Sequence, residues 1–372
     1  MFKKSLIAVA VLGATAFSVQ AADVTMYGKV DLGLQYKTSE VTVGDKTMVD
    51  EDTFSMENGR NSASRFGIKG SEDLGNGMKV SFQLENGFKA DSGEFKTEGK
   101  LFDRQATVAL SSDFGTLTMG RVGGVGSGAG FDLVYGYGDA FDGGDGDVFG
   151  FATSDRYDNM VTYQTPSFSG FQATVQYSLN ESSVDNTKRE NSSQVDRYLG
   201  LALTAELGAL QGVLAYETQN YASFGDKPQA NTEDGQVVYL GGNYDFEVAK
   251  VFVMGQYFKG LAENPFAGDA FEGHPVDGEG VKGFGAHVGT IVPVAGGDFT
   301  GGLYYVDSTV KYAEEDADGK YYGVALKYEY PLSKRTSVYG GTGWYKAKVD
   351  YSADDVYKEE AYQAYLGLTH CF

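Results

Sequence analysis

The chain has 372 residues, with 30 Lys or Arg against 51 Asp or Glu, and a formal net charge of −21. A chain this acidic lacks the basic face with which nucleic-acid-binding proteins neutralise phosphates, so no nucleic acid is expected as a partner. A single cysteine and three histidines without ligand spacing exclude a disulfide framework and cysteine-based zinc sites. No metal and no other cofactor is therefore expected.

Residues 1–21 have the pattern of a secretory signal peptide. Lys3 and Lys4 precede an apolar run over residues 6–17, and Val19 and Ala21 supply the small residues of a cleavage site. The apolar run is shorter than the ~20 residues that a membrane-spanning helix needs. The sequence therefore predicts an exported protein whose mature domain comprises residues 22–372.

From residue 22 onward, apolar and polar residues alternate with a period of two. In residues 78–85 the even positions are apolar and the odd positions are polar, and residues 24–37 and 362–372 show the same alternation. Such a pattern indicates strands with one apolar and one polar face. No helical periodicity is evident after residue 22, so the sequence predicts an all-β fold.

The connections between the predicted strands alternate between short and long. The short ones are 74–77, 113–115, 166–170, 206–208, 245–247, 294–297 and 331–334. The long polar ones are 38–62, 90–100, 122–156, 180–194, 222–235, 260–280, 312–320 and 351–358. Seven short and eight long connections imply sixteen strands, with both ends of the chain on the side of the short turns.

This asymmetry favours a transmembrane antiparallel β-barrel over a soluble sandwich, whose loops would be mixed in length at both ends. A closed barrel leaves no strand edge unpaired in the hydrocarbon, and sixteen strands enclose a water-filled channel. The polar faces are therefore expected to line water. Eight tyrosines near predicted strand ends fit either an interfacial girdle or ordinary strand propensity: Tyr27, Tyr36, Tyr177, Tyr216, Tyr257, Tyr304, Tyr328 and Tyr345.

Several segments resemble one family of membrane barrels. The run SRFGIKGSEDLGNG at residues 64–77 and the segments 104–121 and 155–166 resemble strand–turn–strand units of Gram-negative general porins. The neisserial and beta-proteobacterial branch is the most similar. The ending from Gly367 to Phe372 resembles the terminal strand of that family with its final phenylalanine. The resemblance covers residues 24–372 and is strongest at the turns.

The resemblance implies a homotrimer of sixteen-stranded barrels in the bacterial outer membrane, in contact with lipid and lipopolysaccharide. It implies that the terminal Phe372 is recognised by the barrel-assembly machinery. It also implies passive diffusion of small hydrophilic solutes and ions, filtered by size and charge at an eyelet where a long third loop folds into the lumen.

Residue matches to the family imply a basic cluster of Arg65, Arg104 and Arg156 at this eyelet, with Lys29 as a fourth member. Strand parity supports Lys29 and Arg65 as inward-facing, because Lys29 shares a face with Asp31 and Arg65 shares one with Lys69. An arginine facing lipid near mid-bilayer would cost about 2–4 kcal/mol. Arg104 shares its parity with the apolar Val108. It can still point inward if the outer face of this strand lies in a trimer contact.

The third loop, 122–156, is expected to supply the acidic side of the eyelet through Asp139, Asp142, Asp145 and Asp147. Unit charges ~7 Å apart at an effective dielectric constant of ~20 interact by roughly 2 kcal/mol, enough to sort ions. The alternative is that these aspartates belong to a solvated surface loop. The net charge favours a weak preference for cations, whereas a basic eyelet favours anions.

Three other functions remain as alternatives. A sugar-specific channel would carry an aromatic ladder along the lumen, and none is evident at the inward positions. An adhesin would use its external loops, whose sequences say little. A barrel hydrolase would need a catalytic base, and His287, which shares its parity with two glycines, is the only strand histidine in mid-chain. A passive channel rather than an enzyme is therefore favoured.

Overall fold

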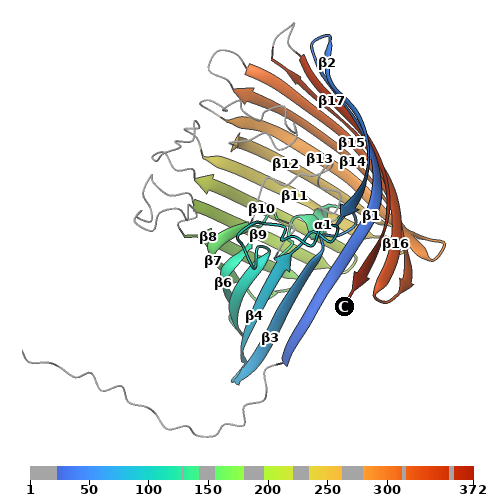
Figure 1. Cartoon of the computed structure of the whole chain (residues 1–372). Coiled ribbons are helices and arrows are strands. Elements are labelled where there is room, and N and C mark those ends of the chain that lie inside the picture. The colour runs from blue at the N-terminus through green and yellow to red at the C-terminus, as the bar shows by residue number, and fades with distance from the viewer. Residues whose placement is uncertain are drawn as a thin grey trace, which may run out of the picture.

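Strands dominate the part of the chain that the structure describes, which contains a single helical turn (Figure 1). The computed structural model describes residues 23–127, 130–141, 156–179, 197–220, 234–261, 280–311, 316–351 and 356–372, so the predicted signal peptide lies outside the described residues. Among the described helices, none is long and apolar enough to cross a membrane.

The described residues contain seventeen strand segments. They are β1 Asp23–Val43, β2 Lys46–Asn58, β3 Arg65–Gly75, β4 Met78–Gly87, β5 Gln105–Ser112, β6 Gly115–Gly123, β7 Arg156–Gln164, β8 Phe171–Ser178, β9 Arg197–Leu207, β10 Leu210–Asn220, β11 Gly235–Asp245, β12 Lys250–Leu261, β13 Val281–Val294, β14 Gly297–Lys311, β15 Asp316–Ser333, β16 Thr336–Asp350 and β17 Val356–Cys371. The helical turn α1, Tyr135–Gly138, follows β6.

These segments make a closed antiparallel barrel of sixteen strands, as predicted. Each segment from β3 to β16 pairs with the next segment in the chain, and β1 pairs with β17 to close the ring. The first half of β1 pairs with β3 and its second half with β2, so β2 and β3 are two parts of one barrel strand. At the seam, the backbone N–H groups of Gly28 and Phe372 each donate to the other's carbonyl, at 3.1 and 3.0 Å.

The seven predicted short turns all connect consecutive strands at one end of the barrel. The first described residue and the C-terminus both lie with them, because Asp23 pairs with Ser71 near the first turn and Phe372 follows the end of β17. In the first turn, Asp73 Oδ1 accepts the backbone N–H of Gly75 at 2.8 Å. Gly75, Asn76 and Gly77 all have positive φ, the conformation that tight hairpins select glycine and asparagine for.

The first long connection is mostly strand rather than loop, which corrects the prediction for residues 38–62. β1 continues to Val43 and β2 begins at Lys46, so that only Gly44 and Asp45 form the turn. Both faces of this hairpin tip carry polar residues, so apolar alternation could not reveal it. What remains irregular is the short segment 59–64 between β2 and β3.

Outward-facing side chains are apolar and exposed around the ring, as in Leu214, Leu240 and Val253. Inward-facing side chains differ between the two halves of the barrel. On β1 they are polar, as predicted, with Asp31 and Gln35 buried. On strands β10 to β16 many are apolar; examples are Val213, Tyr239, Met254 and Ala325.

The tyrosines predicted near strand ends fall into an outward-facing group and an inward-facing group. Tyr36 and Tyr257 face outward and are exposed, whereas Tyr304 and Tyr345 face inward and are buried, so these two belong to no girdle. Tyr27 also points inward, because its hydroxyl donates to Glu85 on the inner wall. The inner face also contains buried aromatic residues: Tyr239, Tyr304, Tyr321 and Tyr345 are all 8% exposed or less.

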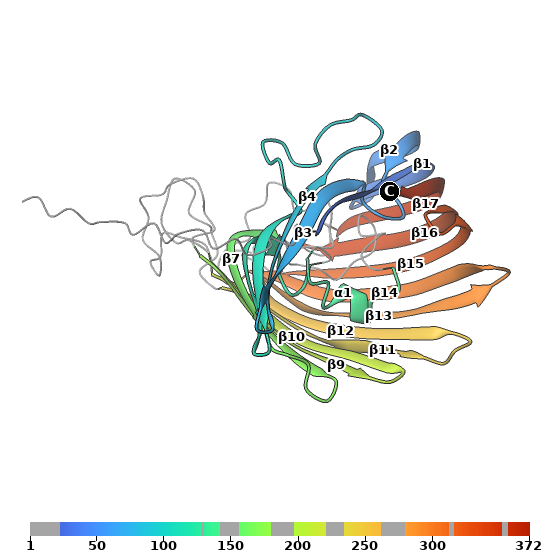
Figure 2. The same ribbon diagram turned by 90° about the horizontal axis from the view of Figure 1, so that it is seen from below.

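Part of the apolar inner wall packs against the described part of the third loop. Figure 2 shows α1 inside the ring of strands. Val134 and Phe141 cluster with Val213 and Met254, and a Cβ at Gly138 would collide with the Met254 side chain. These contacts hold residues 130–141 against the inner faces of β10, β11 and β12.

Hydrogen bonds that join the backbone and the side chain of Tyr137 to the barrel wall reinforce this packing. Asn243 Nδ2 donates to the backbone carbonyl of Tyr137 at 2.9 Å, and the Tyr137 hydroxyl donates to Glu206 Oε1 at 2.8 Å. Burial, followed by this hydrogen bond to the glutamate, raises the pKa of Tyr137 to about 12. The phenol therefore keeps the proton that it donates across the whole physiological pH range.

Candidate functional site

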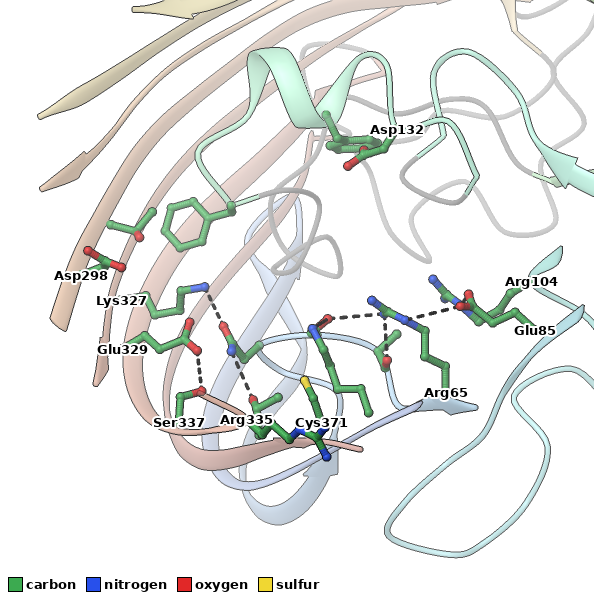
Figure 3. Close-up of a pocket in the computed structure, with 18 of the residues that line it drawn as sticks. Arg65, Glu85, Arg104, Asp132, Asp298, Lys327, Glu329, Arg335, Ser337 and Cys371 are labelled. Atoms are coloured by element: carbon green, nitrogen blue, oxygen red, sulfur yellow. Dashed lines mark hydrogen bonds and ion pairs between the residues drawn. The ribbon is translucent and has the colours of Figure 1, made fainter. Parts of the chain in front are cut away.

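A cavity of about 890 Å³ lies inside the barrel, between the third loop and the inner wall (Figure 3). Its charged lining comes from strands that are far apart in the sequence. Seven lining residues are basic: Lys29, Arg65, Arg104, Arg156, Lys327, Lys334 and Arg335. Four are acidic: Glu85, Asp132, Asp298 and Glu329. The structure thus brings all four sequence-predicted basic residues into one site.

Lys29 and Arg65 stand directly opposite each other in the ladder between β1 and β3. Both side chains face the lumen, as predicted. Lys29 is two residues from the buried Asp31 and so shares its inner face, and Arg65 lies opposite Lys29 on the same face. Because Arg65 is the first residue of β3, its long side chain extends from the strand end into the cavity, where it remains about one-quarter exposed.

Glu85 on β4 organises the arginines and was missed in the sequence. Its Oε1 accepts from Arg104 Nε at 2.7 Å, and its Oε2 lies 3.8 Å from Arg65 Nε and accepts from the Tyr27 hydroxyl at 2.9 Å. One carboxylate therefore holds two guanidinium groups beside each other, as Figure 3 shows. The signal was present, because Glu85 pairs with Gln105 on the inward face next to Arg104.

The parity conflict at Arg104 has a local explanation. Strand β5 begins at Gln105, so Arg104 lies just outside the regular strand and strand alternation does not govern its direction. The backbone N–H of Arg104 donates to the carbonyl of Glu85 at 3.2 Å. A trimer contact is not needed to explain how this arginine points inward.

Arg156 begins β7 and lies opposite Gly123 at the end of β6. Arg156 lines the cavity, and its backbone carbonyl accepts from Arg121 Nη1 at 3.2 Å. Arg121 in turn pairs with Asp158 Oδ1 at 2.6 Å. Arg156 is therefore attached to a part of the wall that is itself cross-linked by an ion pair.

Asp139 has a different position from the one that the sequence suggested. It is 4% exposed and does not line the cavity. Its Oδ1 accepts from the Tyr304 hydroxyl and from the backbone N–H of Phe141, both at 2.9 Å, and lies 3.4 Å from His287 Nε2. The side chain thus attaches the third loop to β13 and β14.

The other carboxylates of the third loop divide between described and undescribed residues. Asp142, Asp145 and Asp147 lie outside the described residues. Asp132, which the sequence placed in the same loop, does line the cavity and has positive φ. Figure 3 shows it on the opposite side of the cavity from the cluster of Arg65 and Arg104.

A second group of charges lines the other wall and was also missed. Lys327 Nζ on β15 donates to Asn61 Oδ1 at 2.7 Å and lies 5.6 Å from the centre of the Phe141 ring. Glu329 accepts a hydrogen bond from Ser337 Oγ. Strand parity could have identified Lys327, because it follows the inward-facing Ala325 by two residues.

His287 occupies the inner wall under the third loop. Its Nδ1–H donates to the carbonyl of Leu303 at 3.2 Å, and its ring stacks on that of Tyr304 with centroids 4.4 Å apart. The parity prediction of a lumen-facing side chain is correct, but the side chain is 1% exposed. Within the described part of the chain, no three His, Cys, Asp or Glu side chains converge as a metal site.

Comparisons with known proteins agree with this architecture. A model of the Gram-negative porin family matches residues 8–350. An outer membrane porin of Bordetella pertussis is 33% identical over 98% of each chain, and the major outer membrane protein P.IB of Neisseria gonorrhoeae is 30% identical over 92% of this chain and 93% of its own.

Solved structures show the same likeness. An anion-selective porin from Comamonas acidovorans superposes with a TM-score of 0.65 at 25% identity, covering 94% of this chain and 100% of the other. The trimer form of OmpT from Vibrio cholerae gives a TM-score of 0.62 at 18% identity, covering 95% of this chain and 100% of its own. The chain belongs to the Gram-negative porin family and forms a channel for passive diffusion across the outer membrane.

Proposed function

We propose that the cavity between the third loop and the inner wall is the charge-selective and size-selective part of the channel, and that it favours small anions. The observation that carries the proposal is the excess of cations, with seven basic side chains against four carboxylates. Two of the basic side chains share one carboxylate, Glu85. Rings of basic side chains select anions in other pores by the same electrostatics.

This proposal departs from the weak cation preference suggested by the net charge. Net charge counts every acidic residue of the chain, whereas a charge more than a Debye length away, ~8 Å at physiological salt, acts weakly on an ion in the channel. The local balance at the narrow part therefore matters more. The Comamonas relative, described as anion-selective, supports the same direction.

The acidic side of the site remains a prediction for Asp142, Asp145 and Asp147. If all three faced the cavity, seven carboxylates would oppose the seven basic side chains and the anion preference would vanish. Selectivity therefore tests two statements at once. A clear anion preference supports the proposal and argues against three inward aspartates.

A passive channel also explains the site better than the alternatives. The inward tyrosines are buried under other residues, so they offer no exposed ladder on which a sugar could slide. His287 is likewise buried and already bonded to a backbone carbonyl, which leaves it poorly placed as the base of a lipase or protease. We therefore propose that the protein is a channel and not an enzyme.

The partners follow from the family. We propose a homotrimer, by analogy with the trimer form of the Vibrio protein, embedded among outer-membrane lipid and lipopolysaccharide. We also propose that the barrel-assembly machinery recognises the terminal Phe372. This residue is 46% exposed at the seam of the barrel, where a partner can reach it.

The direct test is the reversal potential of the purified channel in a planar bilayer with a KCl gradient. A reversal potential shifted from zero toward the chloride equilibrium potential supports the proposal. A reversal potential shifted toward the potassium equilibrium potential refutes it. The single cysteine, Cys371, lines the cavity and offers an internal probe. A negatively charged methanethiosulfonate should lower the chloride permeability more than a positively charged one, and the Cys371→Ser variant should respond to neither.

A further inference from the structure

The barrel strand formed by β2 and β3 contains an insertion. Asn58 pairs with Leu32 of β1, and Arg65 pairs with Lys29. Only two residues of β1 lie between these partners, whereas six residues, 59–64, connect them on the other strand. Four residues therefore have no place in the ladder, and the chain must leave the wall. We call residues 59–64 the shelf.

The shelf extends into the barrel rather than outward. Arg60 Nη2 donates to Gln363 Oε1 at 2.8 Å, and its guanidinium lies 5.2 Å from the centre of the Tyr365 ring. Asn61 Nδ2 donates to Thr369 Oγ1 at 3.2 Å. Gln363, Tyr365 and Thr369 are all buried on the inner face of β17. The shelf therefore crosses the inner side of β1 and rests on β17.

Asp31 and Ser64 fix both ends of the shelf to β1. The Asp31 backbone N–H donates to Ser64 Oγ at 3.0 Å, and the Ser64 hydroxyl is 3.1 Å from the Asp31 carbonyl. Gly59 donates its N–H to the same carbonyl at 3.1 Å and has a φ of 76°, which suits a glycine at the point where the chain turns away. These bonds attach both ends of the shelf to the wall.

Three cationic side chains end on the shelf. Ser62 Oγ accepts from Lys29 Nζ at 2.9 Å and from Arg65 Nη1 at 3.4 Å. Asn61 Oδ1 accepts from Lys327 Nζ at 2.7 Å. The cations come from β1, β3 and β15, and Lys327 also lies over the Phe141 ring at the described end of the third loop. Asn61, Ser62 and Ala63 themselves line the cavity.

We propose that the shelf is a second constriction element besides the third loop, and that Asn61 and Ser62 are selectivity-determining residues of the channel. The shelf narrows the passage because four extra residues occupy space inside the wall. It also holds three cationic head groups at one level of the channel. The direction of the ion preference rests on the proposed function, whereas the effect on width does not.

Width is tested by restoring a continuous strand. Residues 59–64 are replaced by Ser-Val, because the residue opposite Asp31 faces inward and the residue opposite Val30 faces outward. We expect the single-channel conductance to rise by roughly half or more, since conduction depends on the narrowest section. The variant Ala63→Trp, at an exposed position in the cavity, should lower the conductance. Unchanged conductance in both folded variants, or in Ala63→Trp if the shortened chain fails to fold, overturns the proposal.

Selectivity is tested by Asn61→Asp, which places a carboxylate beside Lys327. A unit charge ~7 Å from a passing ion in water changes the local ion concentration by roughly two- to threefold, so the chloride-to-potassium permeability ratio should fall by at least about twofold. The matched control is Asn76→Asp, which makes the same charge change in a turn outside the cavity and should leave the ratio unchanged. Equal effects of the two variants overturn the selectivity role.

These outcomes are separable from failure of the proposed function. If the wild-type channel proves non-selective or cation-selective, the anion proposal fails. The conductance of the shortened and Ala63→Trp variants still reports whether the shelf narrows the channel. A larger effect of Asn61→Asp than of Asn76→Asp still reports that Asn61 faces the ion path.

Discussion

Glu85→Gln is the most informative single substitution at the cavity. Glu85 is the only carboxylate within ion-pair distance of both Arg65 and Arg104 among the described residues. The glutamine keeps the size of the side chain and removes the charge, so the channel gains one unit of positive charge. In water a unit charge ~7 Å away changes an ion's energy by about 0.6 kcal/mol, close to thermal energy. The chloride-to-potassium permeability ratio should therefore rise at least about twofold.

The same substitution should weaken the fold by a measurable amount. The Arg104–Glu85 pair is only 12% and 10% exposed, and a hydrogen bond to a charged group contributes about 1.5–3 kcal/mol. Thermal unfolding in detergent, followed by circular dichroism, should show that loss relative to wild type. Glu94→Gln is the matched control, because Glu94 pairs with Lys89 on an exposed loop. A ratio that falls, or that rises equally in the control, would refute the electrostatic account of the cavity.

Three further predictions concern closure, the third loop and salt. Gly28→Val should disturb the seam, since a Cβ there meets the Phe372 ring and lies 2.8 Å from the Arg65 carbonyl oxygen. The folded fraction, measured by heat-modifiable gel electrophoresis, should therefore fall. The control Gly212→Ala has room for its Cβ and should leave the folded fraction unchanged. Asp139→Asn should increase current noise in single-channel recordings by weakening the bonds that attach the third loop, whereas quiet channels would contradict that role. Raising KCl from ~0.1 to ~1 M should shrink the anion preference, because the Debye length falls from about 10 to 3 Å; a preference independent of salt would argue for steric selection.

The sequence predicted the strand count and the positions of the turns because both depend on local patterns. Alternation reports which side chains share a face, and Asp, Asn and Gly at positions such as 73–77 specify tight turns. The shelf could not be predicted in this way. It lies inside a polar stretch without alternation, and its inward course depends on contacts with Gln363 and Thr369, some 300 residues away in the sequence.

The charged residues show the same limit. Lys29 and Arg65 followed from parity because they lie within regular strands, whereas Arg104 lies one residue before its strand and parity misled. Asp139 looked like a pore carboxylate because an aspartate in a polar loop has no visible partner. Its partners, His287 and Tyr304, come from strands that are distant in the sequence, and only the fold brings these side chains close to Asp139.

The apolar inner wall of β10 to β12 has a physical explanation in the third loop. A loop crossing a water-filled barrel would lose conformational entropy on ordering, about 1–2 kcal/mol for each residue, with little to offset it. Burying a side chain such as Val134 or Phe141 contributes about 1.5–3 kcal/mol, and this requires apolar partners on the wall, such as Val213 and Met254. An apolar inward face in a channel is therefore a sign that an internal segment covers it. The polar wall near β1 needs no such cover, because the shelf there is held by hydrogen bonds to Asp31 and Gln363.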